Sequence, residues 1–196
     1  MTDLRKFLSE IQMLKRVQRS GFPVAGITET DSVAEHALLS AQIAFILAEM
    51  EGADAEKAAI INLFHDNHEA RVGDHNKVSA RYLETGEAEK TAELEQLANL
   101  PDEINHKIID LLNQKRERNT IEGIIAQDAD WLEVAIQAKI YLEQGYTGAQ
   151  NWIDNVENAL ETQTAKKILA EIKNDSDFTN CWWQGIKKMT YTKLDK

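Results

Sequence analysis

The sequence changes character within one stretch, IINLFHDNHEARVGD (residues 60–74). Its first five residues are mostly apolar and continue a helical pattern that begins at Asp54. The ten residues from His65 onward supply three acids, two histidines and one arginine. A buried helix that ends in such a run delivers charged groups into the interior, where they need partners or a metal ion. The stretch therefore predicts a helical protein with a polar site at the end of one helix.

Helical periodicity extends over the rest of the chain. We predict helices over residues 4–19, 32–50, 54–65, 68–73, 101–114, 120–144, 147–160, 162–173 and 177–190, with a polar helical region over 76–99 interrupted near Gly86. Asp31 or Ser32 can cap the second helix, and Gly52 can end it. The pattern contains no convincing strand, internal repeat or low-complexity linker. The predicted fold class is all-α, with residues 1–196 forming a single helical domain.

Composition limits the classes of partner. The chain has 196 residues, 43% of them hydrophobic, which is typical of one compact domain. A net charge of -11 argues against nucleic-acid polymers and membrane surfaces as partners. The single cysteine, Cys181, excludes an intrachain disulfide and a cysteine-based zinc motif. Because we find no signal-peptide pattern and no sufficiently long uninterrupted apolar run, we expect a cytoplasmic protein.

The adjacent pair His65–Asp66 is the first candidate for chemistry. Neighbours on a helix point about 100° apart, so both side chains reach one ion only at a helix end or in a tight pocket. Imidazole nitrogen and carboxylate oxygen suit transition metals and tolerate magnesium. Glu69 shares their face if the helix continues, and a base acting on water would be needed there. His36, early in the second helix, has partly apolar neighbours and is expected to face inward.

A further carboxylate comes from residues 120–144, where two acids interrupt an apolar helix. At 100° per residue, Asp128 shares a face with Ile125 and Leu132, whereas Asp130 lies on the opposite side with Val134. Periodicity alone favours Asp128 as the buried acid. Both faces carry apolar residues, so a central helix buried on two sides would accommodate either one.

An ordered set of motifs resembles the HD-domain superfamily, and within it the small HD-domain 5′-deoxynucleotidases. The matching stretches are residues 14–22, 32–36, 65–74, 100–101 and 127–138. The complete set is a specific signal, whereas a lone His-Asp pair would be weak. The resemblance implies an HD-type helical domain whose core covers residues 14–138, with the helices of residues 147–190 packed on it.

The resemblance also implies roles for individual residues. Four ligands would hold one divalent metal ion (Mn, Co, Fe, Zn or Mg): His36, His65, Asp66 and Asp130. The position of Glu69 is associated with the catalytic water, and those of Arg19 and Asp74 with the nucleotide pocket. Between the two acids of the long helix, the resemblance favours Asp130 over Asp128.

The implied reaction is hydrolysis of a deoxynucleoside 5′-monophosphate to nucleoside and phosphate, carried out by a homodimer. Arg19 can form a bidentate pair with a phosphate and supplies positive charge that the acidic surface lacks. Two other readings stay open: an HD phosphohydrolase for another nucleotide (triphosphate or cyclic), and a non-catalytic metal-binding helical protein. Two departures from the resemblance concern the substrate: Phe22 stands where tryptophan is common, and the residues after Gly73-Asp74, HNKV (75–78), lack the proline that usually follows soon after.

Overall fold

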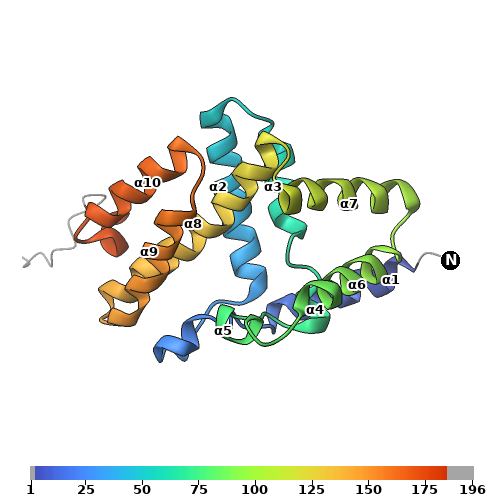
Figure 1. Ribbon diagram of the computed structural model, residues 1–196, viewed down its shortest axis with the longest axis horizontal. Helices are drawn as coiled ribbons and strands as arrows, with labels where there is room; N and C mark the ends of the chain where they lie inside the picture. The colour runs from blue at the N-terminus through green and yellow to red at the C-terminus, as the bar shows by residue number, and fades with distance from the viewer. Residues whose placement is uncertain (1–2, 185–196) are drawn as a thin grey trace, which may run out of the picture.

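The computed structural model describes residues 3–184, and over this range it is helical without a strand. The helices are shown in Figure 1 and have these bounds: α1 (Leu4–Glu10), α2 (Val33–Glu51), α3 (Ala55–Phe64), α4 (Glu69–Val72), α5 (Lys77–Ala80), α6 (Thr85–Leu97), α7 (Asp102–Glu117), α8 (Ile121–Glu143), α9 (Gln150–Ala159) and α10 (Gln163–Asn174). Short 3₁₀ helices accompany them: η1 (Ile11–Lys15), η2 (Phe22–Ala25), η3 (Thr147–Ala149) and η4 (Phe178–Asn180). The predicted all-α fold class is confirmed.

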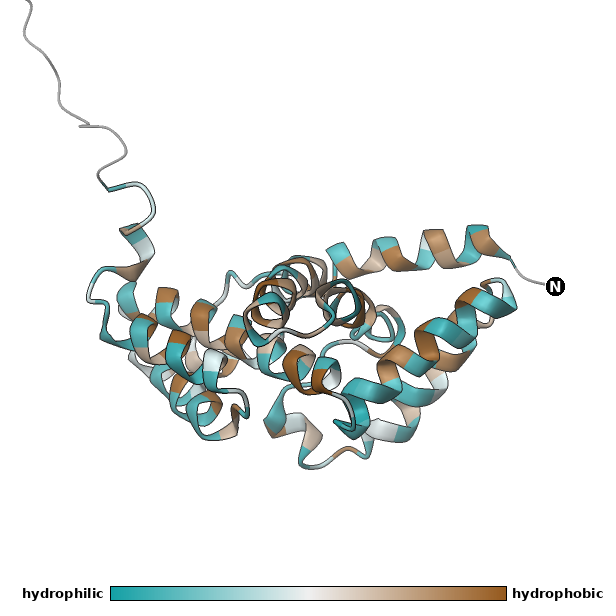
Figure 2. Cartoon of the chain, turned by 90° about the horizontal axis from the view of Figure 1, so that it is seen from above, coloured by the Kyte–Doolittle hydropathy of each residue, from teal (hydrophilic) through white to brown (hydrophobic). Residues whose placement is uncertain are grey.

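Helix α8 is the central element of the fold. It runs through the middle of the molecule and packs against α2, α3, α7, α9 and α10 (Figure 1). The largest hydrophobic cluster joins α2, α8, α9 and α10, and its fully buried members include Leu47, Ile125, Leu132, Ile153 and Leu169. Hydrophobic residues are dense on the helices near the centre of the view, while outer helices alternate hydrophobic and hydrophilic residues (Figure 2). A helix covered by so many neighbours buries polar side chains on more than one face.

Two smaller clusters hold the remaining helices. One joins α1, α6 and α7 through buried residues that include Phe7, Leu97 and Leu112. The other consists of Ile61 and two partners, Leu111 and Ala126, and links α3 to α7 and α8. The end of α3 is therefore fixed against the middle of α8, which positions the residues that follow Phe64.

The start of α2 is fixed by a capping box. The Ser32 hydroxyl accepts a hydrogen bond from the backbone N–H of Glu35, and the Glu35 carboxylate accepts one from the backbone N–H of Ser32. The predicted cap is thus Ser32 rather than Asp31. Gly52 ends the helix in the left-handed region with φ 73°, as expected from its position. These two ends place His36 in the first turn of α2.

The predicted helix over residues 4–19 is wrong beyond Lys15. Helix α1 ends at Glu10 and η1 at Lys15, and the chain then pairs with the segment before α2. The backbone N–H of Arg19 donates to the carbonyl of Asp31 at 2.9 Å, and the backbone N–H of Val33 donates to the carbonyl of Val17 at 2.9 Å. These long-range bonds replace helical ones, so Arg19 lies on a non-helical segment beside the start of α2.

Two further boundaries differ from expectation. The break in the polar region falls at residues 81–84, and Gly86 lies inside α6. The predicted helix over residues 177–190 begins instead as the 3₁₀ turn η4, and its part beyond residue 184 lies outside the described residues. Helices α9 and α10, predicted over 147–173, both pack on α8.

Helix α2 is long and apolar enough to qualify as a candidate membrane span, although its apolar residues are interrupted by polar ones and the sequence analysis expected no such span. Its 18-residue window has a mean hydropathy of 1.3, and 44% of it is buried within the fold. The helix packs against α3 and α8, as the core helix of a helical bundle does. Length and composition alone are weak evidence for a span.

A candidate metal centre at the end of helix α3

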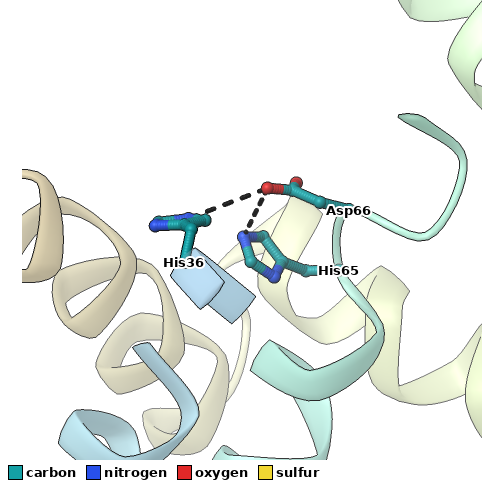
Figure 3. A group of neighbouring side chains, drawn as sticks. All are labelled: His36, His65 and Asp66. Carbon is teal, nitrogen blue, oxygen red and sulfur yellow. Dashed lines mark ion pairs between the residues drawn. The ribbon is translucent and has the colours of Figure 1, made fainter. Parts of the chain in front are cut away.

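Four predicted ligands from three elements meet at one point. His65 and Asp66 lie in the turn that follows α3, His36 lies on α2 and Asp130 on α8. Asp66 Oδ2 lies 3.1 Å from His65 Nε2 and 3.7 Å from His36 Nε2 (Figure 3). Asp130 Oδ1 lies 3.1 Å from His36 Nε2 and 3.8 Å from His65 Nε2. The structure thus brings together all four residues that the resemblance assigns to a metal ion.

Both histidines are oriented by a bond on the other side of the ring. His36 Nδ1 lies 2.5 Å from Glu133 Oε2, and His65 Nδ1 lies 2.8 Å from the carbonyl oxygen of Asn62. Donation from each Nδ1–H makes Nε2 the nitrogen whose lone pair a metal ion can use once any proton on it is displaced. In both rings Nε2 then points toward Asp66 and Asp130, which is the orientation a metal ligand requires.

The carboxylates of the cluster are held ionised. Burial by itself raises the pKa of Asp66, but His65 and Arg19 outweigh it and hold that pKa well below its ordinary value. Burial likewise raises the pKa of Asp130, and Lys115 with His65 reverses the shift, so that it ends far below the ordinary value. Two ionised carboxylates therefore face two imidazoles in a largely buried cluster.

His36 responds to the same charges in the opposite sense. Burial lowers its pKa, but hydrogen bonds with Asp130 and Glu133 outweigh burial and raise the pKa to about 10. The cluster therefore attracts positive charge at this point. A proton on His36 is one way to supply it, and a bound cation is another.

The donor set fits a divalent metal ion. One ligand atom each from His36, His65 and Asp66 lies within 4.8 Å of the others. His65 Nε2 is buried and makes no hydrogen bond, although Asp66 is close, so its lone pair has no protein donor. Two imidazole nitrogens with two carboxylates suit manganese, iron, cobalt or zinc and tolerate magnesium. A cation would satisfy both the orphaned nitrogen and the excess negative charge.

Three positioning residues were not identified from the sequence. Asp130 Oδ2 accepts from Lys115 Nζ at 2.7 Å and from Gln127 Nε2 at 3.1 Å, which leaves Oδ1 for the histidines. Gln127 and Glu133 lie three residues on either side of Asp130 on α8, a helical spacing that could have indicated them. Lys115 is on α7, and no local pattern predicts its contact with α8.

Asn62 is a fourth such residue. Its side-chain amide donates to the carbonyls of Ala126 at 2.9 Å and Ser40 at 3.3 Å, and it is fully buried. These bonds connect α3 with α8 and α2 one turn before His65. A single polar residue within the run IINLF was a signal of this role, because a buried amide needs partners.

Arg19 and Asp74 lie beside the cluster and contact each other. Arg19 Nη1 lies 3.0 Å from Asp74 Oδ2 and 3.4 Å from Asp66 Oδ2. Burial opposes the charge on Arg19, but these acids raise its pKa above the ordinary value, so it remains cationic. Asp74 also accepts from the Ser20 hydroxyl at 2.9 Å. The structure therefore places the guanidinium at the edge of the cluster, with Asp74 holding it.

Glu69, the first residue of α4, reaches the same region. One ligand atom each from Asp66, His68 and Glu69 lies within 4.8 Å of the others. Glu69 Oε2 is buried without a hydrogen-bond partner. Burial, with the nearby charge of Asp66, raises the pKa of Glu69 to about 9. A carboxyl group with so raised a pKa can hold or release a proton at the edge of the cluster.

Asp128 serves a different purpose on the far side of α8. Its carboxylate accepts from the backbone N–H of Glu161 and of Thr162, and from the Thr162 hydroxyl, at 2.7–3.2 Å. It is fully buried and ties α8 to the start of α10. Periodicity was correct that Asp128 is the more buried acid, but this burial belongs to the α8–α10 contact.

Two cavities open onto the cluster. The first, of about 370 Å³, is lined by Arg19, Asp66, Glu69, Asp74 and Asp130 at its polar end and continues between η2, α8 and α9. The second, of about 550 Å³, is lined by polar side chains that include His65, His68 and Lys115. His75 lines both, whereas His106 is exposed on α7. Solvent and a small ligand can therefore reach the ligand atoms.

Comparisons with known proteins agree with this arrangement. The model of the HD domain family matches residues 11–173. The 5′-deoxynucleotidase HDDC2 of Dictyostelium discoideum is 26% identical over 190 residues, which cover 89% of this chain and 99% of that protein. A solved genomics structure is 37% identical, covers 94% of this chain and 100% of that one, and superposes with a TM-score of 0.73. A conserved hypothetical protein from Pyrococcus furiosus is 29% identical over 85% of this chain and 97% of its own, with a TM-score of 0.69.

Proposed function

The chain belongs to the HD domain family, and on that premise we propose that it is a metal-dependent 5′-deoxynucleotidase. It would hydrolyse deoxynucleoside 5′-monophosphates to nucleoside and phosphate. One observation carries the proposal: two histidines and two ionised carboxylates converge beside an arginine at the polar end of one cavity. Relatives that carry the name 5′-deoxynucleotidase match over most of this chain, which supports the choice of substrate class.

One divalent ion would be held by His36, His65, Asp66 and Asp130. When bound, it acts as a Lewis acid on the phosphoryl group and promotes ionisation of water. The donor set of two imidazoles and two carboxylates does not select one metal and accepts Mn, Co, Fe, Zn or Mg. The Nδ1 bonds of the two histidines keep Nε2 directed at the ion, so the site is preorganised rather than assembled by the metal.

Arg19 would bind the phosphate of the substrate. Its Nη1 is held by Asp74 and Asp66, which leaves the rest of the guanidinium fork for phosphate oxygens. Asp74 acts mainly through Arg19: it fixes the guanidinium and adds a contact to the cavity wall. Part of the charge of a phosphate dianion placed there would be offset by Arg19 and the rest by the bound metal ion, whereas the acidic remainder of the surface offers no such compensation.

Glu69 would act as the general base. It lies at the cavity beside Asp66, and a bound cation would counter the raised pKa of its carboxyl, so that the ionised Oε2 can accept a proton from the attacking water. The water oxygen forms a bond to phosphorus while the bond from phosphorus to the 5′-oxygen breaks, and the proton that Glu69 took from water passes to that oxygen. The products are the nucleoside and inorganic phosphate.

Phosphate release from a panel of substrates tests the proposal. The purified protein is assayed with deoxynucleoside mono-, di- and triphosphates and with a cyclic nucleotide, each with Mn, Co, Fe, Zn and Mg. We expect release from monophosphates, abolished by a chelator. Activity on triphosphates or cyclic nucleotides alone would contradict the proposed substrate class. Metal binding without any turnover would favour a non-catalytic metal-binding protein.

We further propose a homodimer, as the resemblance implies, and, from the acidic composition and the lack of a signal-peptide pattern, a cytoplasmic enzyme with a small phosphorylated substrate and no nucleic-acid or membrane partner. Light scattering coupled to size-exclusion chromatography tests the oligomeric state. A monomer of about 22.2 kDa would contradict the dimer without affecting the proposed reaction.

A further inference from the structure

The first cavity extends well beyond the groups that hydrolysis needs. Away from the metal cluster its wall is formed by Phe22, Trp131, Val134, Trp152 and Val156. A phosphate and a metal ion gain nothing from such a surface, because both are strongly hydrated. An apolar, largely aromatic wall continuous with a charged end is typical of a pocket for a ligand that is flat and apolar at one end and anionic at the other.

The ring of Trp152 is a half-buried part of this wall. It packs against Phe22 with ring centroids 5.3 Å apart, and Phe22 in turn contacts Tyr141 edge-on at 4.9 Å. Phe22 itself is only 4% exposed, so it supports Trp152 from behind and offers little surface of its own. The resemblance leads one to expect a tryptophan at position 22, where this chain has phenylalanine. The indole at the cavity comes instead from Trp152 on α9.

Two amides of the same helix complete the wall. Asn151 and Asn155 are one turn apart on α9 on either side of Trp152, and both line the cavity. Asn155 is exposed and Trp152 is half-buried, so the side-chain amide and the indole both present surface to the cavity. An amide offers one donor group and one acceptor, a combination that can pair with the edge of a purine or pyrimidine.

We propose that Trp152 and Asn155 form the nucleobase subsite, in which Trp152 packs on the base and Asn155 contacts its edge. The inference rests on the proposed nucleotidase function. It adds which residues would distinguish a nucleotide from other phosphate monoesters, namely those that contact the base. Arg19 binds the phosphate at one end of the cavity, and α9 binds the base at the other. The acidic surface plays no part in either contact.

Kinetics with matched substrates test this subsite. Deoxyadenosine 5′-monophosphate is compared with 2-deoxyribose 5-phosphate, which has the same sugar and phosphate but no base. Trp152→Ala is expected to raise the KM for the nucleotide about tenfold or more, the order seen when a base-stacking aromatic is removed. Its kinetics with 2-deoxyribose 5-phosphate should be unchanged. Trp182→Ala, at an exposed tryptophan outside the cavity, is the control and should alter neither substrate.

Two more variants keep the test decisive if Trp152→Ala does not fold. Trp152→Leu retains apolar volume without the flat ring and should also raise the nucleotide KM. Asn155→Leu changes an exposed residue and should shift the ratio of kcat/KM between deoxyadenosine and deoxythymidine monophosphates about threefold or more. Unchanged KM values and ratios in both variants would overturn the subsite, as would equal kcat/KM for nucleotide and sugar phosphate in the wild type.

Failure of the subsite and failure of the function give different results. If no monophosphate is hydrolysed by the wild type, the proposed function is wrong whatever α9 does. Calorimetric titration with deoxyadenosine 5′-monophosphate then decides the subsite without turnover. Weaker binding by Trp152→Leu than by wild type supports it, and equal binding refutes it.

Discussion

The carboxylate of Glu133 lies 2.5 Å from Nδ1 of His36, and both side chains are buried. The bond holds the imidazole with Nε2 toward Asp130. Glu133→Gln keeps an acceptor but loses the charge, and we expect metal affinity to fall about tenfold, as is usual for partners of metal-binding histidines. Competition with a fluorescent chelator measures it. Glu143→Gln, also on α8 but bonded to Thr179, should leave metal affinity unchanged. Equal losses in both variants would contradict the role of Glu133.

The two acids of α8 should separate metal binding from stability. Asp130→Asn removes a proposed ligand, so we expect metal binding and turnover to be lost while the protein stays folded. Asp128→Asn leaves the cluster intact but weakens the bonds to Glu161 and Thr162, which should cost about 2 kcal/mol of unfolding free energy. Metal content and urea unfolding are measured for both. Loss of metal in Asp128→Asn with retention in Asp130→Asn would reverse the assignment.

Local sequence patterns were sufficient where the determining contacts are local. The Ser32 cap, the Gly52 ending and the position of His36 follow from short-range hydrogen bonding and side-chain periodicity, and the all-α class follows from their repetition along the chain. The irregular segment from Arg16 to Gly21 could not be foreseen in this way. It is held by backbone bonds from Arg19 and Val33 that connect distant segments.

The site shows the same limit. The run from His65 to Asp74 identified one side of it, because charge at the end of an apolar helix needs an explanation. The choice between Asp128 and Asp130 depended on which helix covers each face of α8, and helical phase carries no such information. The role of Lys115 could not be predicted from the sequence for the same reason, because its contact with Asp130 forms only when α7 packs on α8.

Glu69 should be separable from the metal ligands. We expect Glu69→Gln to bind metal with wild-type stoichiometry and to lose at least about a hundredfold in kcat, the contribution typical of a general base. Metal content is measured by elemental analysis and turnover by phosphate release. Glu87→Gln, on the exposed rim of the second cavity, provides the matched control. Full activity in Glu69→Gln would remove it as the base.

Metal binding should release protons. Hydrogen bonds with Asp130 and Glu133 raise the pKa of His36 to about 10, so below that pH the ion must displace a proton from Nε2. Asp66 and Asp130 have lowered pKa values and are already ionised. Affinity should therefore increase with pH, about tenfold per unit between pH 6 and 8. Calorimetry in buffers of different ionisation enthalpy counts the protons, and a pH-independent affinity would contradict this linkage.

Glu143 should control an acid-sensitive contact at the end of α8. Burial raises its pKa, but bonds from Thr179, Lys139 and the Phe178 backbone N–H outweigh burial and lower it from 4.5 to about 2. A lowered folded-state pKa stabilises the protein above the unfolded value, and this stability is lost as pH falls from about 4.5 toward 2. Glu143→Gln should cost about 2 kcal/mol at pH 7, measured by urea unfolding. The difference in unfolding free energy from wild type should narrow as pH falls from about 4.5 toward 2, because the wild-type carboxylate becomes protonated over that range; a constant difference would contradict the lowered pKa.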